Sequence, residues 1–198
     1  MRSIVTGGAG FIGSHLVDYL VGAGDDVIVI DSLISGDLNS IKNHLDEKRV
    51  TLVSADLLSD SWQEYLSGAD RVYHLAADPD VRESSVAPEK QLNNTIIATH
   101  RVLEAMRKAC VPEIVFTSTS TVYGEASVIP TPESYTPMEP VSVYGASKLA
   151  CEALISAYSH SFSMRSWIFR FANIIGARSG HGVITDFIRK LKENPHEL

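Results

Sequence analysis

The chain has 198 residues, of which 44% are hydrophobic and 21% charged, and its formal net charge is −7. This length suits one sizeable domain, or one with a small appendage, and the composition excludes a disordered protein. Because polyanions need clustered basic side chains and the Lys and Arg residues here are scattered, we expect no nucleic-acid partner. We see no export leader and no membrane-length apolar run, and Cys110 and Cys151 lack metal-ligand spacing, so we expect a cytoplasmic protein without membrane or metal partners.

Short β-branched segments alternate with longer helical patterns, which is typical of a parallel sheet covered by helices. We expect strands at 3–6, 26–30, 50–54, 71–75, 113–118 and 166–171, and helices at about 11–22, 88–109, 145–160 and 183–194. The stretch 125–143 holds four prolines and is expected to form a long, functional surface loop. The predicted fold class is therefore α/β, a Rossmann-type doubly wound parallel sheet with helices on both faces.

The stretch TGGAGFIGSH directly follows the first expected strand and precedes the first helix. It fits Gly8-x-Gly10-x-x-Gly13 and equally Gly7-x-x-Gly10-x-x-Gly13, which are dinucleotide-type spacings. Glycine removes the side chain that would keep a pyrophosphate from the backbone, and the helix N-terminus offers unpaired N–H groups. A turn needed only for packing is the alternative. Asp31 at the end of the second strand weighs against it, since a carboxylate there accepts hydrogen bonds from the adenosine ribose and repels a 2′-phosphate. We therefore predict NAD rather than NADP.

Two further pairs of residues follow expected strands. Asp56 and Leu57 could border the adenine edge, or they could form a turn and a helix cap. Ala76 and Ala77 would let a cofactor lie close to the backbone, although small residues there are also normal packing. The sequence leaves both alternatives open.

The segments FTSTSTVYG and VYGASKLACE carry candidate catalytic groups. Tyr144 and Lys148 are four residues apart, on one face of a helix, and Thr119 follows the fifth strand, so the three side chains could meet above the sheet. A tyrosine has a pKa near 10, whereas a useful base titrates near 7. The Lys148 ammonium acts in the required direction by stabilising the phenolate, and the positive nicotinamide ring of the cofactor adds to the effect. An exposed tyrosine beside a solvated lysine is the alternative.

Nearly the whole chain is covered by passages that follow one another in family order: VTGGAGFIGSHL, VIVIDSL, SADL, VYHLAA, IVFTSTSTVYGE, PVSVYGASKLACE and FRFANIIGARSGHGVI. Through them the chain resembles the extended short-chain dehydrogenase/reductase family, and within it the nucleotide-sugar epimerases, especially UDP-glucose 4-epimerase. The resemblance implies NAD, a UDP-hexose substrate, and epimerisation at C4 between UDP-glucose and UDP-galactose through a 4-keto intermediate.

The resemblance also implies roles for particular residues. Thr119 would bridge the sugar 4-OH, Tyr144 would be the general base, and Lys148 would hold the nicotinamide ribose and tune Tyr144. The implied cofactor contacts are Gly7, Gly10, Phe11, Ile12, Gly13, Asp31, Ser32, Asp56, Leu57, Leu75, Ala76, Ala77, Thr95, Thr117, Tyr144 and Lys148. The implied substrate contacts are Val81, Thr119, Tyr144, Asn173 and Val183, with Asn173 at the diphosphate. Thr95 stands where many relatives have Asn, and Thr119 where several have Ser.

The residues after Thr119 bear on the type of reaction. The related 4,6-dehydratases carry an Asp-Glu pair there, whereas this chain has Ser120 and Thr121. Without an acid to protonate a leaving hydroxyl, elimination is not expected. Glu125 is farther along and is assigned to the loop.

The resemblance implies residues 1–170 as an NAD-binding domain and 171–198 as the start of a truncated substrate-binding lobe. An epimerase in its full-length form, an NAD-binding module with little turnover, and another nucleotide-sugar epimerase or dehydratase all stay open. Relatives pair through the helices expected at 88–109 and 145–160, which implies a homodimer. The apolar stripe there more often indicates core than interface, and it comprises Leu92, Ile96, Leu103 and Met106.

Overall fold

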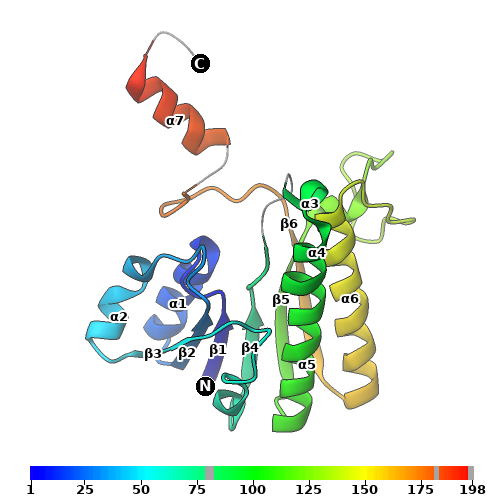
Figure 1. Cartoon of the computed structure of the whole chain (residues 1–198). Helices are drawn as coiled ribbons and strands as arrows, with labels where there is room; N and C mark the ends of the chain where they lie inside the picture. The colour runs from blue at the N-terminus through cyan, green and yellow to red at the C-terminus, as the bar shows by residue number, and fades with distance from the viewer. Residues whose placement is uncertain (79–82, 181–182, 196–198) are drawn as a thin grey trace.

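The computed structural model describes residues 1–78, 83–180 and 183–195. Within these residues, six strands form one parallel sheet in the order β3-β2-β1-β4-β5-β6 (Figure 1). The strands are β1 (Arg2–Thr6), β2 (Asp26–Asp31), β3 (Val50–Ser54), β4 (Arg71–His74), β5 (Glu113–Thr119) and β6 (Arg165–Phe171). The chain runs from β1 outward to β3 and then returns to the other side of β1 with β4. This is the strand order of a doubly wound sheet, so the predicted Rossmann-type fold is confirmed.

The expected helices are present as α1 (Phe11–Gly22), the segments at 88–109, α6 (Val143–Phe162) and α7 (Val183–Glu193). The structure adds short helices that the sequence analysis missed: η1 (Leu38–Ser40), α2 (Lys42–Asp46), η2 (Gln63–Leu66), α3 (Glu83–Val86) and η4 (Ser120–Tyr123). These segments are too short to show a helical period in the sequence. The long loop is confirmed between η4 and α6.

The helix predicted at 88–109 consists of three consecutive segments. They are α4 (Pro88–Gln91), the π-helical η3 (Leu92–Ile97) and α5 (Ala98–Ala109). Short π-helical turns occur often at functional sites. Hydrophobic spacing alone does not distinguish such a turn from an α-helix, so the sequence could not reveal it.

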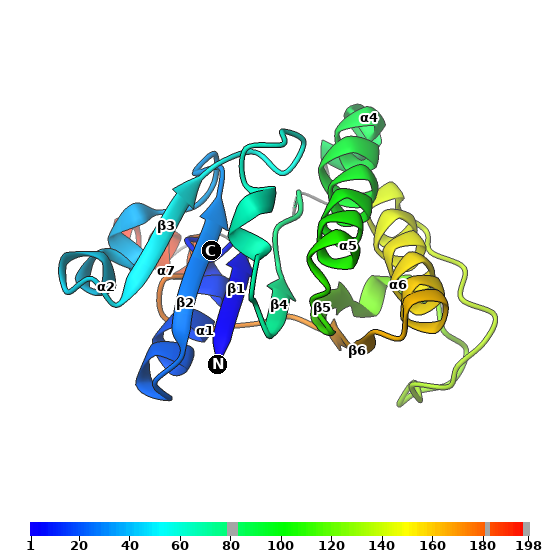
Figure 2. The same cartoon turned by 90° about the horizontal axis from the view of Figure 1, so that it is seen from below.

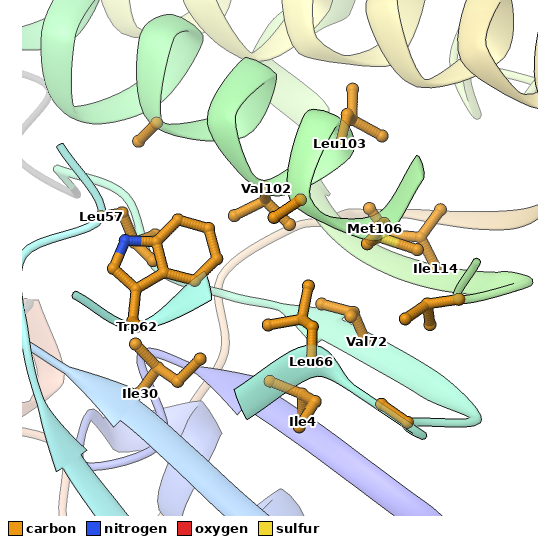
Figure 3. Close-up of a cluster of buried hydrophobic side chains, with 14 of the residues drawn as sticks. Ile4, Ile30, Leu57, Trp62, Leu66, Val72, Val102, Leu103, Met106 and Ile114 are labelled. Atoms are coloured by element: carbon orange, nitrogen blue, oxygen red, sulfur yellow. The ribbon is translucent and has the colours of Figure 1, made fainter. Parts of the chain in front are cut away.

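One hydrophobic core lies between the sheet and the α5–α6 layer. Trp62 and Leu66 pack there with Val102 of α5 and Ile4 of β1 (Figure 3). Two residues of the predicted apolar stripe, Leu103 and Met106, are fully buried in this cluster. Leu92 is 47% exposed and Ile96 packs at the edge of the cluster. The core interpretation is therefore confirmed for the C-terminal half of the stripe.

A second core lies on the opposite face of the sheet, under α1. Val17 and Leu20 of α1 pack with Val5 and Val29. Figure 2 shows α1 and the α5–α6 pair on opposite faces. This second layer does not extend to β6, where Trp167 is 40% exposed. Among the described residues, β6 pairs only with β5. None of the described helices is long and apolar enough to cross a membrane.

Candidate active site

The glycine loop packs backbone against backbone. Gly7 has a φ of +71°, and a Cβ added there would lie 2.8 Å from the backbone nitrogen of Ala76, which follows β4. A Cβ at Gly13 would lie 2.1 Å from the carbonyl oxygen of Gly7. Both positions therefore require glycine unless the backbone moves. The loop lies between β1 and β4, where the connections lead to opposite sides of the sheet: from β1 toward β2 and β3, and from β4 toward β5 and β6. Doubly wound sheets bind dinucleotides at this point.

The first turn of α1 faces this loop. Gly10 is the N-cap residue and offers no side-chain hydrogen bond, and the first turn contains no acidic residue. Phe11 and Ile12 begin the helix and are half-buried. The backbone N–H groups and the positive end of the helix dipole are thus available to an anion. A cradle without side chains beneath an uncapped helix N-terminus fits the pyrophosphate of NAD.

Asp31 is held rigidly at the end of β2. It is 8% exposed, and its two carboxylate oxygens accept hydrogen bonds from the backbone N–H groups of Ala9 and Leu33, each at 2.9 Å. Gly36 lies against it, since a Cβ there would be 2.9 Å from Asp31 Oδ1. A carboxylate has about four lone-pair sites, so each oxygen keeps an acceptor position. Asp31 is therefore placed to accept from two ribose hydroxyls.

The end of β4 joins the glycine loop through Thr6. The N–H of Leu75 donates to the Thr6 carbonyl at 3.1 Å, and the N–H of Ala76 donates to the Thr6 hydroxyl at 3.3 Å. Leu75, Ala76 and Ala77 are all half-buried. The structure thus places Leu75 and Ala76 beside Gly7, and contact of these residues with the cofactor stays a prediction.

Asp56 and Leu57 adopt the turn alternative. The exposed Asp56 carboxylate accepts from the N–H of Leu58 at 2.8 Å, and the Asp56 carbonyl accepts from the N–H of Ser59 at 2.9 Å. Leu57 is 7% exposed and belongs to the core that contains Trp62 (Figure 3). Contact of these two residues with adenine stays a prediction.

Thr119 and Tyr144 meet above the carboxyl end of β5. The Thr119 hydroxyl oxygen accepts from the N–H of Thr121 at 3.2 Å and from the Thr121 hydroxyl at 3.1 Å. Its own proton is therefore free to be donated outward, and Thr119 hydrogen-bonds the Tyr144 phenol. Ser142 caps α6 through a hydrogen bond from the N–H of Gly145 at 3.0 Å, which fixes the first helical turn that carries Tyr144.

Lys148 lies one turn along α6 and is 3% exposed. Its ammonium donates to the Thr117 carbonyl at 2.9 Å and lies 4.7 Å from the centre of the Phe116 ring. Burial lowers the pKa of Lys148 to about 8. The ammonium is therefore still largely protonated at neutral pH.

Burial dominates the pKa of Tyr144 in the chain itself. It raises the pKa of this phenol above its ordinary value, and the hydrogen bond from Thr119 only partly opposes the rise. The Lys148 ammonium is directed to the Thr117 carbonyl. Lowering of the Tyr144 pKa by Lys148 together with the positive nicotinamide ring of the cofactor stays a prediction.

A buried polar chain lies behind Lys148. The two ring nitrogens of His74 are hydrogen-bonded to the hydroxyls of Thr6 at 2.7 Å and Thr99 at 2.9 Å, and the Cys151 thiol donates to Thr99 at 3.3 Å. Burial, and then the positive charge of Lys148, lower the pKa of His74 to about 3. His74 is thus a neutral link between the β1 end and the helices.

Thr95 is used inside the protein. It is 1% exposed in η3, its hydroxyl donates to the Gln91 side chain at 3.2 Å, and its carbonyl accepts from the Cys151 thiol at 3.5 Å. Contact with the cofactor stays a prediction at this position.

The remaining predicted residues lie around the same edge of the sheet or outside the described part of the chain. Thr117 is half-buried, whereas Ser32 and Asn173 are exposed. Val81 and the side chain of Val183 lie outside the described residues.

The sequence analysis missed an ionic network beneath Thr119. Arg170 of β6 donates to both carboxylate oxygens of Glu152, with a closest distance of 2.7 Å, and to the Tyr123 hydroxyl at 2.9 Å. Glu152 also accepts from the Ser118 hydroxyl. A signal was present, because charged residues inside an otherwise apolar strand and helix are expected to pair when buried.

A cavity of 640 Å³ lies beside this network. Its walls come from η4, the long loop and β6, and include Ser120, Tyr123 and Phe169. It contains none of the predicted site residues. The candidate site described above lies elsewhere, at the glycine loop and the α6 N-terminus.

Comparisons with known proteins identify the family of this chain. A family model described as the NAD dependent epimerase/dehydratase family matches residues 3–198. A putative UDP-glucose 4-epimerase of Methanocaldococcus jannaschii is 37% identical over 96% of this chain and 63% of its own length. A crystal structure of UDP-galactose 4-epimerase has a TM-score of 0.89 and 47% identity, over 98% of this chain and 64% of its own. The UDP-glucuronic acid 4-epimerase of Bacillus cereus, solved with UDP-glucuronic acid and NAD, has a TM-score of 0.88 and 32% identity, over 98% of this chain and 63% of its own.

The chain spans less than two thirds of the length of these relatives. The family model nevertheless covers all but its first two residues, including the glycine loop, Asp31 and the segment from Thr119 to Lys148. This chain belongs to the NAD dependent epimerase/dehydratase family, whose cofactor is NAD.

Proposed function

We propose that this chain is the NAD-binding part of a nucleotide-sugar 4-epimerase that interconverts UDP-glucose and UDP-galactose. The observation that carries the proposal is the meeting of Thr119, Tyr144 and the buried Lys148 at the same sheet edge as the glycine loop. Relatives named for 4-epimerisation of UDP-glucose and UDP-galactose support the reaction class.

The glycine loop and Asp31 would hold the cofactor, with the pyrophosphate at Gly10 and the adenosine ribose at the carboxylate. When bound, NAD supplies the hydride acceptor and donor that epimerisation requires. The Asp31 carboxylate would repel a 2′-phosphate, which favours NAD over NADP.

Tyr144 acts as the general base. It would take the proton of the sugar 4-OH while bound NAD supplies the acceptor for the C4 hydride, which gives a 4-keto sugar. With the opposite face of the keto sugar presented to the reduced cofactor, Tyr144 would return the proton to O4. Because Thr119 already accepts two hydrogen bonds from Thr121, it donates its own proton to the phenolate or to the sugar oxygen.

The raised pKa of Tyr144 has to fall before the phenol can act as a base. Lys148 is the cation of this chain that stands nearest in sequence on the same helix face. A shift of its ammonium from the Thr117 carbonyl toward Tyr144 would stabilise the phenolate.

Two hydroxyl residues favour epimerisation over dehydration. Ser120 is exposed and Thr121 supports Thr119, so neither supplies an acid for a leaving hydroxyl. Glu125 is exposed in the long loop.

We extend the proposal to the organisation of the protein. Residues 1–170 hold NAD and 171–198 begin a substrate-binding lobe, with Asn173 at the UDP diphosphate. A homodimer through the helices at 88–109 and 145–160 would cover exposed apolar residues of η3, such as Leu92 and Ile97.

A second candidate function is an NAD-binding module with little turnover. It is favoured by the raised pKa of Tyr144, which is not that of a base, beside a formed glycine loop and Asp31. Such a module would bind NAD by the same loop but would not interconvert sugars.

The test pairs calorimetric NAD binding with conversion of UDP-galactose to UDP-glucose, followed by chromatography. Tyr144→Phe should bind NAD normally and lose about 100-fold or more in rate, since it removes the general base. Tyr19→Phe is the matched control, because Tyr19 is 73% exposed on α1. NAD binding without conversion in the wild type would support the second candidate, and no NAD binding would refute both.

A further inference from the structure

The segment that follows β6, residues 172–180, is attached to α1. β6 is the edge strand of the sheet beyond β5, whereas α1 packs on β1 and β2. The segment leaves the carboxyl end of β6 and runs past the ends of the intervening strands to α1 (Figure 1). It therefore crosses the edge at which the glycine loop opens. We call residues 172–180 the crossing segment.

Three contacts hold the crossing segment to one face of α1. His15 Nε2 donates to the Ala177 carbonyl at 2.8 Å. The Arg178 guanidinium pairs with the Asp18 carboxylate at 2.8 Å. Gly176 packs on the Phe11 ring, because a Cβ there would lie 3.4 Å from two ring carbons.

These contacts are on the outer face of α1, opposite the residues that pack on the sheet. The buried residues of α1 include Val17 and Leu20, whereas His15 is exposed. The fold therefore does not need His15 for its core. Phe11 is itself a predicted cofactor contact at the helix N-terminus, so the crossing segment reaches the cofactor site directly.

The backbone conformation of Arg178 also indicates that the attachment is specific. Its φ is +67°, a conformation that residues with side chains rarely adopt. Its partner Asp18 is also bonded by His44 Nε2 of α2 at 2.6 Å. Burial raises the pKa of the Asp18 carboxyl, but hydrogen bonds and charges from His44 and Arg178 outweigh it and lower the pKa. Asp18 is thus an ionised anchor on α1.

We propose that His15, Asp18 and Arg178 are positioning residues that hold the crossing segment over the cofactor site and thereby slow the release of NAD. The inference rests on the proposed placement of NAD at the glycine loop. The bound cofactor leaves only after the crossing segment detaches from α1, so weakening either anchor speeds dissociation.

The test measures release of NADH from this chain by stopped flow, with excess NAD as the displacing ligand and NADH fluorescence as the signal. His15→Phe keeps the ring contact with Phe11 but removes the donor to Ala177. Arg178→Asn removes the guanidinium but tolerates the positive φ. Each should raise the dissociation rate about three- to tenfold, the range of one lost hydrogen bond or ion pair, whereas Arg178→Lys should retain most of the wild-type behaviour.

Matched controls separate this role from a general structural one. His100→Phe replaces another exposed histidine in an edge-on ring contact, with Tyr158, and Arg189→Asn removes another arginine–aspartate pair, with Asp186. Both should leave the dissociation rate and the unfolding midpoint unchanged. If Arg178→Asn fails to fold, Asp18→Asn tests the same pair from the side of α1.

Unchanged NADH release in His15→Phe and in the folded variant of the Arg178–Asp18 pair, with NADH still bound, would overturn the inference and leave the proposed function standing. Failure of the wild type to bind NADH would overturn the cofactor site itself and this inference with it. Faster release that is matched by the two controls would also overturn it.

Discussion

Replacing Gly13 with alanine should destabilise the chain, whereas the same replacement at Gly22 of the same helix should stabilise it. At Gly13 the new Cβ would lie 2.1 Å from the Gly7 carbonyl oxygen, more than 1 Å closer than the 3.4 Å at which ordinary contact begins. The atoms that the new Cβ would meet are backbone atoms of Gly7 and Gly8, so the turn itself has to move. Overpacking of this kind costs about 1–3 kcal/mol. At Gly22 no atom lies within 4 Å of the new Cβ, and alanine stabilises a helix by roughly 0.5–1 kcal/mol relative to glycine.

The two variants should therefore differ by about 1.5–4 kcal/mol in free energy of unfolding, or roughly 3–16 °C in Tm for a chain of this size. Urea unfolding followed by circular dichroism measures the difference, and calorimetry should show weaker NAD binding in Gly13→Ala only. Equal urea midpoints, or a higher midpoint for Gly13→Ala, would refute the steric argument.

Two further variants probe charge. Asp31→Asn should weaken NAD binding by roughly 10- to 100-fold, because hydrogen bonds to a charged carboxylate are lost. It should also reduce the preference for NAD over NADP, because the charge that repels the 2′-phosphate is removed. Asp37 is an exposed aspartate that also caps its own turn, so Asp37→Asn should change neither the NAD affinity nor the preference for NAD in calorimetry. An unchanged ratio of NAD affinity to NADP affinity in Asp31→Asn would contradict the ribose assignment. Burial and the charge of Lys148 lower the pKa of His74 from 6.5 to about 3, so the unfolded chain takes up this proton below pH 6.5 while the folded chain does so only near pH 3. The wild type should therefore lose roughly 1.4 kcal/mol per pH unit relative to His74→Gln between pH 6 and pH 4 in urea unfolding, and parallel pH profiles would show that His74 is not the group responsible.

Local patterns were sufficient where the structural requirement is itself local. The loop from Gly7 to Gly13 and the carboxylate of Asp31 were predicted because a tight strand-to-helix turn and a residue at a strand end depend on neighbours in sequence. The apolar runs likewise located β1 and β2, because a strand buried on both faces is continuously hydrophobic. Leu103 and Met106 followed from the same helical spacing as the rest of their stripe.

Other features depend on partners that the chain brings in from a distance. The sequence could not show where the Lys148 ammonium points, because it donates to the Thr117 carbonyl, an acceptor that only the packing of α6 on β5 supplies. The attachment of Ala177 to His15 joins residues at opposite ends of the chain, and no spacing in the sequence indicates it.

The sequence by itself determined the succession of strands and longer helices along the chain and the glycine turn, because periodicity and backbone sterics act over a few residues. The tertiary structure decided which donor meets which acceptor and how deeply each group is buried. Those two properties set the protonation state of Tyr144, Lys148 and His74, since a pKa depends on burial and on charges that arrive through space rather than along the chain.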